Sequence, residues 1–187
     1  MGTSHNVISA SGDGSIRRWT REGKPVGKPW HSNGGPVGSI TVSPDKTMVV
    51  SVSIDGRLRL WNIKEGKMVG DPWEMHTAAA RCLDWSPNDL EIASASQDST
   101  VRRWNPDTGR QIGPTIETGH EWVYAVKYSL QSDKIASCGM DSMIRVWSKD
   151  GKLLIEIKGH DVRVNSLCWS KDDAHIFSGS FDGTIRK

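Results

Sequence analysis

Four tryptophans recur along this chain about every 43 residues, and each of them closes a phrase of the same form. The first phrase begins at Ser9, has Asp13 four residues later and ends at Trp19, with an aliphatic residue and an arginine shortly before the tryptophan. The later phrases end at Trp61, Trp104 and Trp147, and a fifth, without a tryptophan, covers residues 178–187. A period of this length is typical of stacked blades of β-sheet and not of a single catalytic domain.

Alternating runs rich in β-branched and aromatic side chains predict the strands of each unit. In the unit of residues 118–158 the predicted strands are 123–128, 134–138, 143–147 and 153–157. Short corners containing Asp, Ser or Gly separate these runs and suit tight hairpin turns. No stretch keeps a helical period for more than one turn, so we predict an all-β fold with four antiparallel strands per blade.

The same division covers the whole chain as one domain of about 4.3 repeats, which makes an incomplete ring. We predict the last three strands of a first blade at 5–30, complete blades at 31–75, 76–118 and 119–158, and the first three strands of a fifth at 159–187. Open blades expose unpaired strand edges, which are templates for association. We therefore expect either a longer propeller or a homo-oligomer, with a two-chain ring of about eight blades as the leading structure.

Charge and cysteine usage narrow the class of protein. The formal net charge is +2 over 187 residues, without a basic or acidic tract, so neither nucleic acid nor a membrane is an expected partner. Cys82, Cys138 and Cys168 are odd in number and lack CxxC spacing, which predicts reduced thiols. Residues 1–5 lack the pattern of a signal peptide, so we expect a cytoplasmic location, with the nucleus as an alternative.

A serine, an aspartate and a histidine recur with the tryptophan, and together they invite a hydrolase interpretation. A catalytic triad is assembled once, however, whereas these residues repeat in every unit. Histidines one blade apart do not converge as zinc ligands do, so we expect no metal and no cofactor. We predict instead a buried chain in which Asp bonds His, His bonds Ser, and Ser accepts the indole N–H. Its predicted members are His31, Ser51, Asp55 and Trp61; His76, Ser94, Asp98 and Trp104; His120, Ser137, Asp141 and Trp147; and His160, Ser178 and Asp182.

These residues carry a family resemblance. Gly-His at 119–120 and 159–160, the Ser-x-x-x-Asp spacing and the Ile/Val-Arg-x-Trp ending together resemble WD40 repeats over essentially the whole chain. The tryptophan is never followed by Asp here, and Trp30 and Met75 stand where Gly precedes the histidine in other units. The phrases at 26–30, 69–73 and 112–115 resemble those of fungal WD40 arrays, including arrays appended to NACHT-type signalling NTPases. This chain has no nucleotide-binding loop of its own.

The resemblance implies a binding face, because WD40 relatives bind partners through the start of the first strand and the residue before the corner aspartate. Among these positions Trp122, Tyr124 and Met140 have the composition of an interface hot spot. The alternative is that Trp122 packs on a neighbouring blade. Transferred to this chain, the face consists of Ala79, Arg81 and Gln97; Trp122, Tyr124 and Met140; and Arg163, Asn165 and Phe181.

Two further sets of residues receive structural roles. We expect Trp85 and Trp169 to lie in the core, and the third-strand arginines Arg17, Arg59, Arg102, Arg145 and Arg186 to join one blade to the next. The function we expect is a non-catalytic scaffold that presents a propeller face to a protein or peptide. The alternative is a regulatory repeat module of a larger signalling NTPase.

Overall fold

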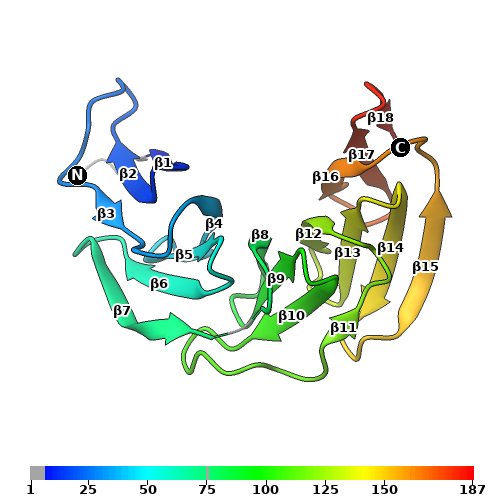
Figure 1. Ribbon diagram of the computed structural model, residues 1–187, viewed down its shortest axis with the longest axis horizontal. Helices are drawn as coiled ribbons and strands as arrows, with labels where there is room; N and C mark the ends of the chain where they lie inside the picture. The colour runs from blue at the N-terminus through cyan, green and yellow to red at the C-terminus, as the bar shows by residue number, and fades with distance from the viewer. Residues whose placement is uncertain (1–6, 75) are drawn as a thin grey trace.

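The chain forms five antiparallel sheets arranged side by side in an open arc (Figure 1). The computed structural model describes residues 7–74 and 76–187. Residues 5–6, at the start of the first predicted blade, and Met75, at the end of the second, lie outside the described residues. No helix occurs among the residues described, and every sheet is a simple meander, so the predicted all-β fold is confirmed.

The end sheets have three strands and the central sheets have four. The first sheet contains β1 (Val7–Ala10), β2 (Ser15–Trp19) and β3 (Trp30–His31). The second contains β4 (Val37–Val42), β5 (Met48–Ser53), β6 (Leu58–Asn62) and β7 (Lys67–Trp73). The third contains β8 (Ala80–Trp85), β9 (Ile92–Ser96), β10 (Thr100–Trp104) and β11 (Ile116–Glu117). The fourth contains β12 (Val123–Tyr128), β13 (Lys134–Gly139), β14 (Met143–Ser148) and β15 (Leu153–Lys158), and the fifth β16 (Val164–Trp169), β17 (Ile176–Ser180) and β18 (Ile185–Arg186).

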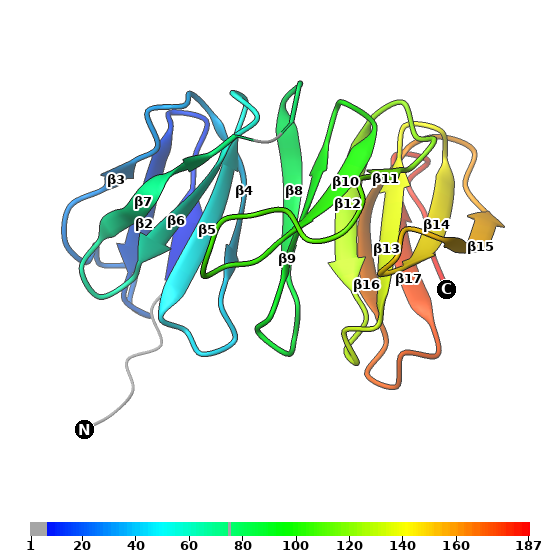
Figure 2. The same ribbon diagram turned by 90° about the horizontal axis from the view of Figure 1, so that it is seen from below.

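Each complete sheet runs from an inner strand to an outer strand of the arc. The inner strands β4, β8, β12 and β16 line the hollow side, and β7, β11 and β15 lie at the outer rim (Figure 1). Figure 2, turned by 90°, shows the sheets standing next to one another with their loops at two opposite ends. Loops from different blades are thereby gathered on two common surfaces.

Apolar packing between neighbouring sheets follows one rule. An outer-strand side chain of one blade packs with the phrase-ending tryptophan of the next: Trp30 stacks on Trp61 at a ring-centroid distance of 5.9 Å. Trp73 packs against the cluster that contains Trp104, and Ile116 shares a cluster with Trp147. The phrase-ending residues Trp61, Trp104 and Trp147 are 3–5% exposed, so the repeated tryptophan is a blade-to-blade contact. Burial of such surface is the main favourable term in folding.

Two other tryptophans that we predicted to lie in the core, Trp85 and Trp169, are buried to different extents. Trp85 is buried in the core between the second and third blades. Trp169 is half-buried, and its indole N–H donates to the Lys127 carbonyl of the preceding blade over 3.2 Å.

Polar ties also join the blades, although through residues other than those predicted. Asp84 of the third blade accepts from Lys127 Nζ at 2.7 Å and from the Tyr128 amide at 2.8 Å, both in the fourth. The blade-to-blade role predicted for the third-strand arginines is wrong for Arg59 and Arg145. Both side chains bind carboxylates of their own blade, because an aspartate lies four residues earlier at the same corner.

Candidate interaction surface

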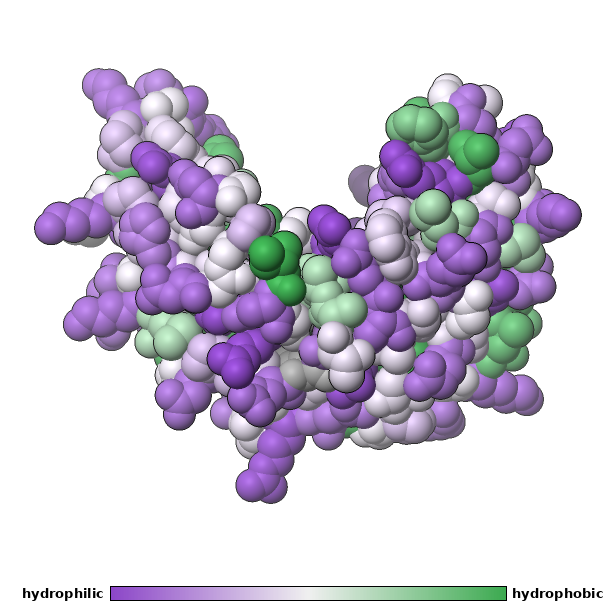
Figure 3. Space-filling view, viewed as in Figure 1, coloured by the Kyte–Doolittle hydropathy of each residue, from purple (hydrophilic) through white to green (hydrophobic). Residues whose placement is uncertain are grey.

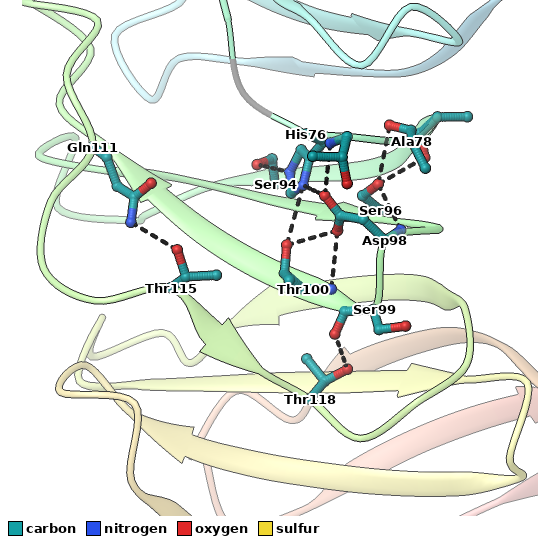
Figure 4. A network of polar contacts seen from close by, with 12 residues as sticks. His76, Ala78, Ser94, Ser96, Asp98, Ser99, Thr100, Gln111, Thr115 and Thr118 are labelled. Atoms are coloured by element: carbon teal, nitrogen blue, oxygen red, sulfur yellow. Dashed lines mark hydrogen bonds and ion pairs between the residues drawn. The ribbon is translucent and has the colours of Figure 1, made fainter.

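The third blade holds a complete version of the predicted polar chain, and Figure 4 shows its His76, Ser94 and Asp98 members. The indole N–H of Trp104 donates to Ser94 Oγ at 3.0 Å, and Ser94 Oγ lies 2.8 Å from His76 Nε2. His76 Nδ1 is 2.9 Å from Asp98 Oδ2, and the hydroxyl of Thr100 donates to Asp98 Oδ1 at 2.7 Å. The loop before β8, strand β9, strand β10 and the corner between these two strands are thus tied together inside one blade.

The direction of these bonds follows from what each group can donate. An ionised aspartate only accepts, so the Nδ1 atom of a neutral histidine must carry the proton that faces Asp98. Nε2 is then an acceptor and receives the Ser94 hydroxyl, whose oxygen in turn accepts the indole N–H. Burial opposes ionisation of Asp98, but the bonds from His76 and Thr100 outweigh it and hold the pKa of this carboxyl well below its usual range.

The fourth blade repeats the chain with one addition. His120 lies 2.6 Å from Asp141 Oδ1 and 3.1 Å from Ser137 Oγ, which accepts from Trp147 at 2.9 Å. Arg145 also donates to Asp141 Oδ2 at 2.6 Å. Burial of the ring lowers the pKa of His120 against the opposing effect of Asp141, and the charge of Arg145 acts in the same direction as burial.

The other blades hold parts of the chain. His160 bonds Asp182 and Ser178, each at 2.8 Å, and Trp61 donates to Ser51 at 2.9 Å. The prediction for His31 is wrong. His31 lies in β3, the outer strand of the first sheet, where it pairs with Ser15 of β2, and its side chain is exposed. Asp55 of the second blade binds Arg59 at 2.6 Å instead of a histidine. Because β3 runs from Trp30 to His31, the predicted blade boundary before residue 31 falls one residue too early.

The burial of the serines decides what the repeated set can do. Ser51, Ser94 and Ser137 have no exposed surface, and Ser178 is 3% exposed. A hydroxyl that is enclosed and bonded to an indole cannot reach the carbonyl of a substrate, so the set supports the fold. Among residues 7–74 and 76–187, no three or more His, Cys, Asp or Glu side chains are grouped in a way that could hold a metal ion.

The predicted binding residues lie at equivalent places in three blades. The residue before each corner aspartate donates its amide to the residue that precedes the inner strand: Gln97 to Ala79 at 3.0 Å, Met140 to Trp122 at 3.0 Å and Phe181 to Arg163 at 3.1 Å. The strand register shifts just afterwards, around Arg81, Tyr124 and Asn165. Such bulges re-aim a side chain, and here they place one more residue per blade beside the loops.

Aromatic and cationic side chains form a continuous group across the fourth and fifth blades. Trp122 is 44% exposed and meets Tyr124 edge to face at a centroid distance of 6.4 Å. The guanidinium of Arg163 lies 4.1 Å from the ring centroid of Phe181 and 5.9 Å from that of Tyr124. Tyr124 Oη also donates to the sulfur of Met140 at 3.4 Å. We call these five residues the aromatic group.

The aromatic group borders an open hollow of about 440 Å³ between two blades. Its lining includes Met140, Arg163 and the 66% exposed Phe181, together with Asp141 and Asp161. Figure 3 shows hydrophobic residues along the inner side of the arc, separated by hydrophilic ones. The surface is therefore mixed, with apolar points set among charges.

The third blade extends this face with polar residues. The side chain of Arg81 is exposed and donates to the side-chain amide oxygen of Gln97 at 2.9 Å, while Ala79 is half-buried. The prediction missed Ile54, which precedes the corner aspartate of the second blade and is 48% exposed. The Ile54 amide donates to the Pro36 carbonyl, as the equivalent residues of the later blades do to theirs, so the repeat register could have identified Ile54.

Side-by-side four-stranded meanders with a buried tryptophan in each repeat define the blades of a β-propeller. The family model described as "WD domain, G-beta repeat" matches residues 23–62, 70–105, 113–148 and 151–187, and the chain belongs to the WD40 repeat family. WD40 repeats typically form protein-interaction scaffolds and are generally non-catalytic. A comparison with curated proteins gave no match. In the part of the chain that the structure describes, no helix has the length and apolar character needed to cross a bilayer.

Proposed function

We propose that this chain is a non-catalytic scaffold that binds an extended peptide through the face containing the aromatic group. The partner has an apolar anchor residue with an acidic residue beside it. The observation that carries the proposal is the exposure of Trp122, Met140 and Phe181 on adjoining blades, next to Arg163. Clustered aromatic and arginine side chains are the residues most enriched at binding hot spots.

The contacts already present define the chemistry of the partner. Arg163 is held against the ring of Phe181, so its position is set before binding and little side-chain entropy is lost when it meets a carboxylate. Arg81 supplies a second cation on the same face. Asp141 is engaged by His120 and Arg145, so the hollow is less acidic than its composition alone indicates.

The test measures binding of fluorescein-labelled peptides that contain one Leu, Ile or Phe next to Glu, by fluorescence anisotropy. Trp122→Ala should weaken the best peptide by about 30-fold, equivalent to about 2 kcal/mol, and leave the melting temperature nearly unchanged. Leu130→Ala is the matched control, because Leu130 is 45% exposed but lies in the turn at the opposite end of the same blade. A loss of stability without a loss of affinity would show that Trp122 is blade-to-blade packing.

The regulatory module of a larger NTPase stays a prediction, because the family match covers the repeats alone. A cytoplasmic or nuclear location is part of the proposal. Cys82, Cys138 and Cys168 are all unpaired thiols, as expected for a reducing compartment.

A further inference from the structure

A second hollow lies between the second and third blades, at the end of the blades opposite to the aromatic group. It holds about 180 Å³ and is formed by the β4–β5 turn, the β8–β9 turn and the loop between β10 and β11. Met48, Leu60, Trp85 and Pro106 give it apolar walls. We call it the acidic hollow, because the remaining lining includes three aspartates.

Those aspartates are Asp45, Asp89 and Asp107. Asp45 accepts from the hydroxyls of Ser43 at 2.5 Å and Thr47 at 2.7 Å, and these bonds lower its pKa, so its carboxylate is charged. Within residues 7–74 and 76–187, none of the three aspartates forms an ion pair with a basic side chain. The acidic hollow therefore gathers negative charge without an internal counter-ion.

Asp89 lacks the partners that its equivalent in the fifth blade has. Asp173 occupies the same place in its turn, with φ 54° against 63° for Asp89, and its carboxylate accepts the amides of residues 130 and 131 in the preceding blade at 2.8 and 2.9 Å. In the blade before Asp89, the corresponding residues are Pro44, which has no amide hydrogen, and Asp45, which is negatively charged. Oδ1 of Asp89 is therefore buried without a hydrogen-bond partner.

A second polar group in the acidic hollow is also left without a bond. Trp85 is 7% exposed, and its indole N–H has no hydrogen-bond partner. Burial and the charge of Asp45 raise the pKa of Asp89, and the nearby Trp85 indole opposes them without forming a bond of ordinary geometry. Enclosed polar groups are nearly always paired in proteins, so an unbonded acceptor beside an unbonded donor indicates a place for a ligand.

The chemistry of that ligand follows from the lining. Three carboxylates favour a positive charge, and apolar walls favour a hydrocarbon stem. In the part of the chain that the structure describes, no His, Cys, Asp and Glu side chains are grouped so as to hold a metal ion, which leaves an organic cation.

We infer that the acidic hollow binds one lysine or arginine side chain of a protein partner. The methylene stem lies against Leu60 and Trp85, and the cationic group donates to Oδ1 of Asp89. A main-chain carbonyl of the partner accepts the indole N–H of Trp85. This site does not depend on the proposed function, because the aromatic group lies at the other end of the blades and in other blades.

Nuclear magnetic resonance tests the inference on the full 187-residue chain. The probes are Nα-acetyl-lysine methylamide and Nα-acetyl-arginine methylamide, and the control is the lysine compound with its side-chain amine acetylated. The Trp85 indole N–H signal, assigned with Trp85→Phe, should shift saturably with the basic probes and stay in place with the neutral control. The basic probe with the lower dissociation constant identifies the preferred residue. An indole signal that neither basic probe moves would overturn the inference.

A pair of equivalent variants separates binding from folding. Asp89→Asn should weaken the better probe by about tenfold, because it removes a charged hydrogen-bond acceptor. It should not lower the melting temperature, since the carboxylate has no internal partner and faces like charges. Asp173→Asn is the matched control: it disturbs two amide bonds, so it should lower the melting temperature and leave the dissociation constant unchanged. An unchanged dissociation constant in Asp89→Asn, or a loss of stability equal to that of Asp173→Asn, would contradict the assignment of Asp89.

Discussion

At the scale of single residues, the buried histidine is the centre of each complete polar chain. His76 and His120 each bond an aspartate through Nδ1 and a serine through Nε2, so both ring nitrogens are satisfied. Removal of one partner leaves another polar atom enclosed without a bond, and that loss exceeds the net value of the bond itself.

The first prediction concerns Asp98, which accepts from His76, Thr100 and the Thr77 amide. Asp98→Ala should lower the free energy of unfolding by about 1–3 kcal/mol, because it leaves these donors unpaired. Asp98→Asn keeps one acceptor oxygen and should cost less. Urea unfolding followed by tryptophan fluorescence measures both, and equal losses for the two variants would contradict the explanation.

A pH dependence follows from His120. Burial lowers its pKa in the folded state below the ordinary 6.5, so the unfolded chain binds more protons on the acid side of that value. Stability is therefore fully present above about pH 6.5 and falls as the pH drops toward the folded pKa. Urea unfolding between pH 8 and 5 measures the slope. His120→Gln should be less stable at pH 8 but show a shallower slope, and an unchanged slope would contradict this assignment.

The sequence predicted the polar residues correctly where they repeat in phase, as for Ser94, Asp98 and Trp104. It failed at His31, which lies 24 residues before Asp55, whereas the bonded histidines lie 21 or 22 residues before their aspartates, so His31 falls in β3 and not in the loop that follows it. Arg59 bonding Asp55 was also missed, since an arginine occupies the same place in every phrase and spacing alone does not show which carboxylate it binds. Exposure of the aromatic group likewise depends on loop geometry that spacing does not give.

At the scale of elements, neighbouring blades are held by a few buried polar centres as well as by apolar packing. Glu91 is 9% exposed and accepts from Arg103 of its own sheet at 2.9 Å. It also accepts from Lys149 at 2.8 Å and from the Tyr128 hydroxyl at 3.1 Å, both in the next blade. One carboxylate thus fixes the position of two sheets relative to each other.

Glu91→Ala should destabilise the protein by about 3–5 kcal/mol, because it leaves the buried Arg103 guanidinium without its counter-ion. The matched control is Glu156→Ala, which removes the 45% exposed partner of Arg145 at 2.7 Å and should cost less than about 1 kcal/mol. Thermal unfolding by calorimetry compares the two. Similar shifts in melting temperature would mean that the contacts of Glu91 stabilise the protein no more than a surface ion pair does.

At the scale of the whole molecule, the blades form a line in which each sheet packs mainly on its neighbours. Stability in such an array is close to a sum of blade and interface terms, so sheets with two neighbours are held more strongly than sheets with one. The burial pattern agrees: the phrase-ending tryptophans of the three central sheets are nearly enclosed, while Trp19 in the first sheet is only partly buried.

The last prediction is therefore an order of hydrogen exchange. Amides of β8–β14 should exchange most slowly, and those of β1–β3 and β16–β18 should exchange first, because the end sheets open without disturbing two interfaces. Mass spectrometry of peptic fragments follows each sheet separately. Equal protection along the chain would show that the five sheets open as one unit.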